Sequence, residues 1–226
     1  MVAKQVAQLE TLGDLLVSLG RISPMRVFIT PTPGTATVWD VARLLDRDKR
    51  LVELVDGTLV EKVYGIVKSV MGVQIGYLLS NWNEQAGKVG WVAGASGPFR
   101  LGKKLVRIPD VSFTRWTRLQ GRKVPTESVP LLAPTLAVEV LSEGNTRLEM
   151  ERKLKEYFLA GVLLVWLVDP KRRTVRVFTS PDDVTELGVR DTLDGGDVLP
   201  GFAVPVARLF ADLGDAPRPA KKKKKR

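Results

Sequence analysis

Two acidic residues in successive apolar runs, Asp110 and Glu139, are the residues of this sequence best suited to chemistry. Asp110 belongs to R-I-P-D-V-S-F, and Glu139 belongs to L-A-V-E-V-L-S-E-G-N-T. Short apolar runs bounded by Pro, Gly or Ser are typical of buried strands. A carboxylate in a buried strand is costly to desolvate unless a cation pairs with it. The two acids together predict a Mg²⁺ site, because Mg²⁺ is usually held by one or two carboxylates and by substrate phosphate oxygens.

A lysine and a third acid complete this candidate site. The helix predicted after Glu139 has Met150 at the centre of its inner face, and Lys153 lies about 60° from that line. Lys153 therefore points toward the sheet, and Glu149, four residues earlier, could orient its ammonium. Glu53 stands on the first arm of a predicted hairpin, where it could complete the metal shell or hold a metal-bound water.

These residue types suit hydrolysis of a phosphodiester. A cation held by Asp110 and Glu139 would lower the pKa of a bound water and offset charge in the transition state. Lys153 could orient or deprotonate that water. Simpler roles exist for each residue: Asp110 could cap a turn, Lys153 could extend its ammonium to solvent from the helix edge, and Glu53 could be an exposed hairpin residue.

The composition excludes several other chemistries. The 226 residues include no Cys and no His. Disulfides, thiolate nucleophiles, Ser-His triads and His-based metal sites are therefore excluded, and catalysis would rest on Asp, Glu, Lys, Tyr, Ser or a metal. The sequence has no apolar stretch of membrane-spanning length and no secretory leader, so we expect a cytoplasmic protein with no membrane partner.

The formal charge of +10 is concentrated at the end of the chain. K-K-K-K-K-R at residues 221–226 supplies six of these charges. A solvated tail that adds non-specific affinity for polyanions is the simpler interpretation of this run. We expect three parts: an N-terminal helix and linker arm over residues 1–36, one domain over 37–213 and a disordered Lys-rich tail over 214–226.

Local patterns predict an α/β domain with a mixed central sheet flanked by helices. Helical spacing indicates helices over residues 6–20, from a Thr37 cap to about Leu45, and over 65–85. Asp-Gly within L-V-E-L-V-D-G-T-L-V-E-K-V predicts a hairpin over 51–63. Further strands are expected at these places: residues 89–93 and 97–101, the two acid-bearing runs, L-V-W-L-V-D-P and T-V-R-V-F. Asn145 or Thr146 can cap the helix that carries Lys153, and a terminal helix is expected near residues 206–213.

The ordered motifs resemble a known family. E-L-V-D-G-T-L-V-E, P-D-V-S-F, A-V-E-V-L-S-E-G-N-T, R-K-L-K-E-Y-F-L-A-G-V and V-W-L-V-D-P are similar to the Uma2-like restriction endonuclease family (DUF820) of the PD-(D/E)XK nuclease superfamily. The resemblance covers about residues 38–210. It implies a restriction-endonuclease-like core, Mg²⁺-dependent (or Mn²⁺-dependent) cleavage of DNA, and roles for Asp110, Glu139 and Glu53 as the family's acids.

One position departs from the superfamily pattern. A lysine usually stands two residues after the second acid, and here that residue is Leu141; the resemblance places the lysine at Lys153 instead. Two alternatives to a DNA endonuclease therefore stay open. The protein could keep the fold but act as a nucleic-acid-binding or regulatory module. It could also be a structural protein whose long helix and N-terminal arm form a homodimer, as restriction-like nucleases often do.

Overall fold

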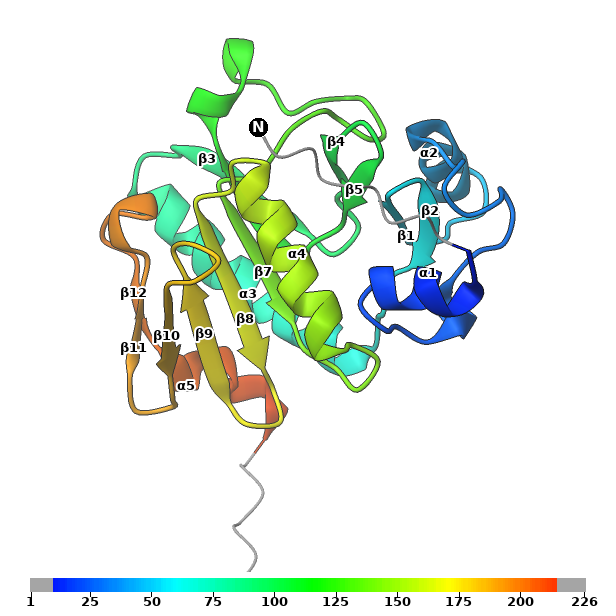
Figure 1. Ribbon diagram of the computed structural model, residues 1–226. Coiled ribbons are helices and arrows are strands. Elements are labelled where there is room, and N and C mark those ends of the chain that lie inside the picture. The colour runs from blue at the N-terminus through cyan, green and yellow to red at the C-terminus, as the bar shows by residue number, and fades with distance from the viewer. Residues whose placement is uncertain (1–9, 215–226) are drawn as a thin grey trace, which may run out of the picture.

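A six-stranded mixed sheet lies at the centre of the protein in the computed structural model, which describes residues 10–214 (Figure 1). The helices are α1 (Leu12–Ser18), α2 (Val38–Asp46), α3 (Ile66–Gln85), α4 (Arg147–Leu159) and α5 (Val206–Leu209). The strands are β1 (Val52–Val55), β2 (Thr58–Glu61), β3 (Gly90–Gly94), β4 (Phe99–Gly102), β5 (Leu105–Arg107), β6 (Val111–Arg115), β7 (Leu136–Val140), β8 (Leu164–Asp169), β9 (Thr174–Phe178), β10 (Val184–Leu187), β11 (Thr192–Asp194) and β12 (Ala203–Pro205). The predicted α/β class with a mixed sheet flanked by helices is confirmed.

The central sheet has the strand order β10-β9-β8-β7-β6-β3. Its β7 and β8 strands are parallel, with Glu139 paired to Leu167, and α4 is the crossover between them. The other neighbours in this sheet are antiparallel. Because β7 is a central strand with all five residues buried, Glu139 enters the interior.

Helices cover both faces of this sheet. Figure 1 shows α4 in front of β7 and β8 and α3 behind the sheet. Apolar residues of α3, such as Met71 and Leu79, share a core with Val138, Val140 and Trp166. On the other face, Met150, Leu154 and Tyr157 of α4 pack with Ala137, Val165 and Leu167. Successive side chains of a strand point to opposite faces, so the odd-numbered residues of β7, Ala137 and Glu139, face α4.

A second, four-stranded sheet has the order β2-β1-β5-β4. The predicted hairpin forms its first pair, and its turn residues Asp56 and Gly57 have φ angles of 50° and 78°. Positive φ at both positions is the type I′ requirement that Asp-Gly satisfies. Thr37 caps α2 as predicted, with a reciprocal capping box to Asp40.

The run from Arg107 to Phe113 is two strands rather than the single strand that we predicted. Arg107 ends β5 in the four-stranded sheet, whereas Val111 begins β6 in the central sheet. Pro109 lies between them, and its lack of an N–H group prevents a continuous hydrogen-bond ladder. Asp110 therefore lies at the junction of the two sheets and not inside a strand.

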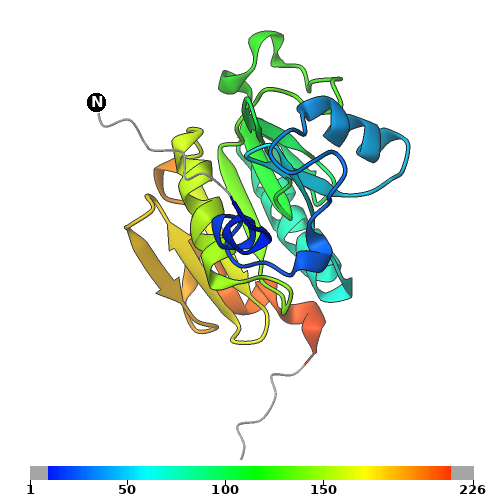
Figure 2. The ribbon, with the colours of Figure 1, turned by 45° about the vertical axis from the view of Figure 1, so that its right-hand side comes forward.

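The described part of the N-terminal arm packs on its own chain. Leu15, Leu19 and Ile22 form a small core with Val55 and Val60 of the hairpin. Figure 2 shows α1 in front of α4. Of the predicted helix over residues 6–20, the structure has Leu12–Ser18, begun by a Thr11 capping box. The predicted tail lies outside the described residues, apart from Gly214. No helix within residues 10–214 has both the length and the apolar character needed to cross a bilayer.

Gly20 fixes how closely the arm approaches α4, which gives a first prediction. Its φ is +89°, and a Cβ there would lie 2.5 Å from the Glu149 nitrogen. We expect Gly20→Ala to lower the free energy of unfolding by about 1–3 kcal/mol, because both the φ and the contact become unfavourable. Urea unfolding followed by circular dichroism measures this. Gly76→Ala in α3 is the control: a Cβ there meets nothing within 4 Å, so stability should be unchanged or higher by up to about 1 kcal/mol. Equal midpoints for Gly20→Ala and the unmodified chain would contradict the prediction.

Candidate active site

The predicted acids reach one buried region from three different parts of the fold. Glu53 comes from β1, Asp110 from the junction of the two sheets, and Glu139 from β7. Their exposures are 0%, 1% and 1%. Lys153 of α4, 3% exposed, faces the same region. Carboxylates that are so little exposed to solvent need hydrogen bonds or ion pairs from the protein to offset the loss of hydration. The partners of each acid therefore define what the site can do.

Lys153 joins two of the acids. Its Nζ lies 2.9 Å from Oε1 of Glu53 and 3.1 Å from Oε1 of Glu139. The hydroxyl of Tyr157, one helical turn along α4, donates to the same Glu139 oxygen at 2.7 Å. The prediction that Lys153 points toward the sheet is confirmed. Tyr157 packs in the core beneath α4, and its hydroxyl also belongs to the site.

Asp110 is held by two other lysines. Lys62 Nζ lies 2.8 Å from Oδ1, and Lys68 Nζ lies 3.0 Å from Oδ2. The Val140 N–H also donates to Oδ2, and the Asp110 N–H donates to the Val138 carbonyl. Both chain neighbours of Glu139 therefore bond to Asp110, which places Asp110 beside β7.

Glu53 has partners on both oxygens. Arg107 Nη1 lies 2.7 Å from Oε2, while the Ile108 N–H donates to Oε1 at 3.1 Å. Arg107 in turn pairs with Glu156 of α4. Among the described residues, Lys153 thus joins Glu53 to Glu139, while Asp110 has its own pair of lysines, Lys62 and Lys68.

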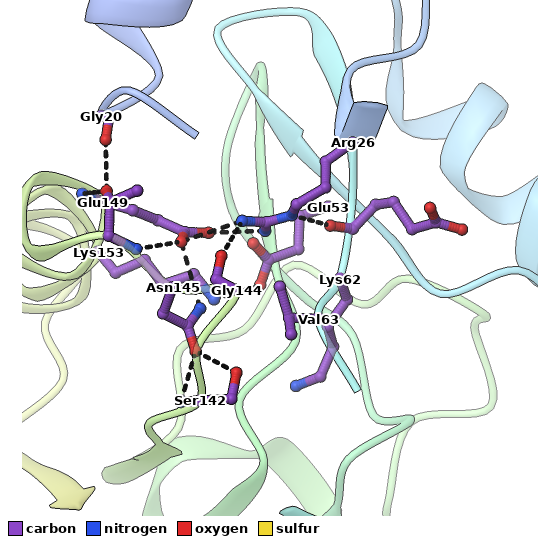
Figure 3. Close-up of polar contacts among 12 residues, drawn as sticks. Gly20, Arg26, Glu53, Lys62, Val63, Ser142, Gly144, Asn145, Glu149 and Lys153 are labelled. Atoms are coloured by element: carbon purple, nitrogen blue, oxygen red, sulfur yellow. Dashed lines mark hydrogen bonds and ion pairs between the residues drawn. The ribbon is translucent and has the colours of Figure 1, made fainter. Parts of the chain in front are cut away.

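Glu149 forms its ion pair with a residue of the arm and not with Lys153, although the charges of Glu149 and Lys153 still act on each other. It forms an ion pair with Arg26, whose Nη2 lies 2.7 Å from Oε1, and it also accepts hydrogen bonds from Asn145 and the Thr146 N–H (Figure 3). Arg26 also donates to the carbonyls of Glu61 and Gly144. This arginine therefore ties the arm to the hairpin and to the start of α4, next to Glu53 and Lys153. The carboxylate of Glu149 also caps the first turn of α4, as the partner of Thr146 in a capping box.

Burial and charge act in opposite directions on the pKa values here. Burial alone would raise the pKa of Glu53, but the charges of Lys153, Arg107 and Lys62 outweigh it and lower that pKa. Burial would likewise raise the pKa of Asp110, but the charges of Lys62 and Lys68 outweigh it and lower that pKa. Burial would lower the pKa of Lys153, yet Glu139 and Glu53 raise it. Burial and the neighbouring Glu139 raise the pKa of Tyr157. At neutral pH Glu53 and Asp110 are therefore carboxylates, Lys153 is an ammonium and Tyr157 is a neutral phenol.

These shifts predict how stability depends on pH. Glu53, Asp110 and Glu149 have lowered pKa values in the folded state, so their stabilisation is present above the unfolded values near 4 and is lost as pH falls. We expect the free energy of unfolding to fall by about 2 kcal/mol or more between pH 6 and pH 3. Urea unfolding across that range measures it. Glu53→Gln should flatten the dependence, whereas Glu84→Gln, an exposed acid of α3, should not. A slope unaffected by Glu53→Gln would show that this acid is not the source.

The carboxylate oxygens of Asp110 and Glu139 suit a hard divalent cation. Carboxylate oxygens are the ligands that Mg²⁺ prefers, and no described residue donates to Oε2 of Glu139. Within residues 10–214, no three acidic side chains lie close enough together to form a metal-binding group. A cation on Asp110 would therefore take the place of Lys62 or Lys68. Glu53 is less suited, because its two oxygens already have Arg107, Ile108 and Lys153 as partners.

Several site residues were not predicted from the sequence. Lys62, Lys68 and Arg107 pair directly with the predicted acids. Arg107 stands in the R-I-P-D motif beside Asp110, and Lys62 follows an apolar strand; a basic residue bordering an apolar run was the available signal.

The fold and this buried acid-lysine cluster define an α/β protein of the restriction-endonuclease-like class. The Uma2 family, described as "Putative restriction endonuclease", matches residues 39–207, and the chain belongs to this family. Its fold is similar to a crystal structure described as a putative nuclease belonging to DUF820 from Anabaena variabilis ATCC 29413. The TM-score is 0.63 and the identity 16%, over 72% of this chain and 91% of that chain. No curated protein matches the sequence. The predicted family is thus confirmed, and the family's restriction-endonuclease-like proteins generally use divalent metals.

Proposed function

We propose that this protein is a Mg²⁺-dependent endonuclease that hydrolyses phosphodiester bonds of DNA. The proposal is supported by family membership and by one observation above the others. The lysine that the superfamily pattern requires is absent at Leu141, and the Lys153 ammonium lies 3.1 Å from the Glu139 carboxylate. A residue fourteen positions along the chain thus supplies the missing positive charge at the second acid.

We assign Asp110 and Glu139 as the residues that would hold Mg²⁺ or Mn²⁺, with Glu53 as the third acid of the site. When bound, the cation would activate water and offset negative charge on the phosphate. Tyr157 fixes one oxygen of Glu139, and Lys153 fixes the same oxygen, which leaves Oε2 for a ligand. The raised pKa of Lys153 keeps it protonated, so it would stabilise developing charge rather than act as a base. Glu53 and Arg107 would position Lys153.

Supercoiled plasmid tests the proposal. Purified protein should nick or linearise it with MgCl₂ and should not do so with EDTA. Asp110→Asn should lose this activity, whereas Asp46→Asn, an acid of α2 remote from the site, should keep it. Cleavage by Asp110→Asn at the unmodified rate would remove Asp110 from the mechanism.

A second candidate function is a nucleic-acid-binding or regulatory module without turnover. It is favoured by the near-complete burial of the three acids and by their existing ion pairs. This function predicts salt-dependent DNA affinity that survives loss of Asp110 and Glu139, with no cleavage. The same plasmid assay and a binding titration with the two variants separate the two functions.

A homodimer also remains a proposal for this chain. The apolar residues of the N-terminal arm, Leu15, Leu19 and Ile22, pack within the chain. We therefore propose that any dimer forms through another surface, and light scattering on the full chain gives the mass.

A further inference from the structure

A groove of about 1350 Å³ opens next to the site. It runs along the free side of α4, between the first turn of α3, the loop after β7, the β8–β9 turn and the start of β10. Figure 1 shows α4 over β7 and β8, whereas β9 and β10 have no helix in front of them. The volume exceeds the roughly 300–1,000 Å³ of small-molecule pockets, so the groove has room for an extended ligand.

The groove borders the candidate site at Lys68. Lys68 lines it, and the Nζ of Lys68 lies 3.0 Å from Oδ2 of Asp110. Leu141 and Ser142 line it as well, and they follow Glu139 by two and three residues. A ligand in the groove would therefore lie one side chain away from Asp110, across Lys68, and beside the residues that directly follow Glu139 and Val140.

The floor and part of the rim are apolar. Met150, Leu154, Leu167 and Phe178 form the floor, each buried beneath the opening. At the rim, Tyr64, Ile66, Val67 and Val184 are 72%, 79%, 44% and 48% exposed. Apolar side chains that stay exposed beside an apolar floor mark a binding surface rather than a solvated one.

Charge complementarity identifies the class of ligand. Seven Lys and Arg side chains line the groove, against four Asp and Glu. Lys155, Lys171 and Arg176 form no ion pair among the described residues, and the Arg176 guanidinium lies 5.9 Å from the centre of the Phe178 ring. A basic rim suits phosphates, while an apolar floor with an exposed tyrosine suits the faces of bases. A stacked duplex hides those faces, and a strand with unpaired bases presents them.

We propose that this groove binds a nucleic-acid strand with unpaired bases and delivers its backbone to Asp110 and Glu139. Bases would stack on Tyr64 and the apolar floor, and Lys171 and Arg176 would contact phosphates. The proposal rests on the proposed nuclease function and specifies its substrate as a single strand, flap or frayed end. It depends on the shape and charge of the groove and not on the metal chemistry.

Fluorescence anisotropy with the full chain in EDTA tests binding without cleavage. The probes are a labelled 20-nucleotide DNA strand, an RNA strand of the same sequence, and the DNA duplex. At least one single strand should bind about tenfold more tightly than the duplex. Tyr64→Ala should weaken single-strand binding about tenfold, as expected for one stacked base, and leave duplex binding within about twofold. Lys171→Ala should reduce the salt dependence of single-strand binding by about one phosphate contact.

Tyr77→Ala is the matched control, because Tyr77 is a tyrosine of α3 with 58% exposure that does not line the groove. The proposal is overturned if the duplex binds as tightly as both single strands, or if Tyr64→Ala and Tyr77→Ala behave alike. It is also overturned if the groove variants change the sedimenting mass instead of affinity, since the groove would then contact a second copy of the chain. Plasmid cleavage with MgCl₂ is scored separately. Preferential single-strand binding without cleavage would reject the nuclease but keep the groove assignment, and cleavage without that preference would do the reverse.

Discussion

Glu139→Gln is expected to lower Mg²⁺-dependent plasmid cleavage by about 10²–10³-fold. The substitution keeps the size of the side chain, and its amide oxygen can still accept the Tyr157 hydroxyl. It removes the negative charge that would hold the cation and that helps to hold Lys153. A loss of this size is typical when one charged or hydrogen-bonding group is removed from a transition-state site. The rate of loss of supercoiled plasmid, at saturating MgCl₂, gives the value.

Two controls separate loss of chemistry from loss of fold. Glu84→Gln alters an exposed acid of α3 and should cleave at the unmodified rate. Circular dichroism of Glu139→Gln should match that of the unmodified chain. If the well-folded Glu139→Gln protein cleaves as fast as the Glu84→Gln protein, Glu139 has no part in the reaction.

Lys153→Ala is expected to give the largest loss of stability, about 3–5 kcal/mol at pH 7. Lys153 is 3% exposed and is shared by Glu53 and Glu139. Removal of one partner from a buried ion pair costs this amount because it leaves an uncompensated charge. Without Lys153, Glu53 would keep Arg107 and the Ile108 N–H as partners, whereas Glu139 would keep the Tyr157 hydroxyl. Urea unfolding at 25 °C measures the change.

The origin of this loss can be tested with a second substitution. If uncompensated charge is responsible, the Glu139→Gln/Lys153→Met double variant should be more stable than Lys153→Met alone. The double variant removes the negative charge of Glu139 together with the positive charge that compensated it. Arg152→Ala is the control for removal of a basic side chain from α4; it is 21% exposed and should cost less. A loss below about 1 kcal/mol for Lys153→Ala would mean that the pairs of Lys153 contribute little net stability.

Features set by nearby residues could be predicted from the sequence alone. The Asp-Gly turn, the Thr37 cap and the twenty-residue α3 depend on φ preferences, side chain to backbone bonds and a repeat of 3.6 residues. Each of the three features depends only on residues that are close together in the sequence. The same holds for the orientation of Lys153, because the face of a helix follows from spacing once its ends are known.

The acid types and their placement in apolar runs also identified the candidate site. An acid within L-A-V-E-V needs a basic partner wherever the strand is buried, and this requirement does not depend on which residue provides it. The sequence therefore determined that Glu139 would be compensated. It could not determine that the Tyr157 hydroxyl would also donate a hydrogen bond to Glu139, since a tyrosine on an inner helix face is usually part of the core.

The tertiary structure decided the pairings. Lys153 meets Glu53 across 100 positions, Arg26 meets Glu149 across 123, and Lys62 meets Ile108 across 46. Such contacts depend on how two sheets and α4 are packed, and no local pattern encodes them. The position of Asp110 was also decided by the tertiary structure. Pro109 interrupts the hydrogen-bond ladder locally, but only the packing of the two sheets places Asp110 at their junction.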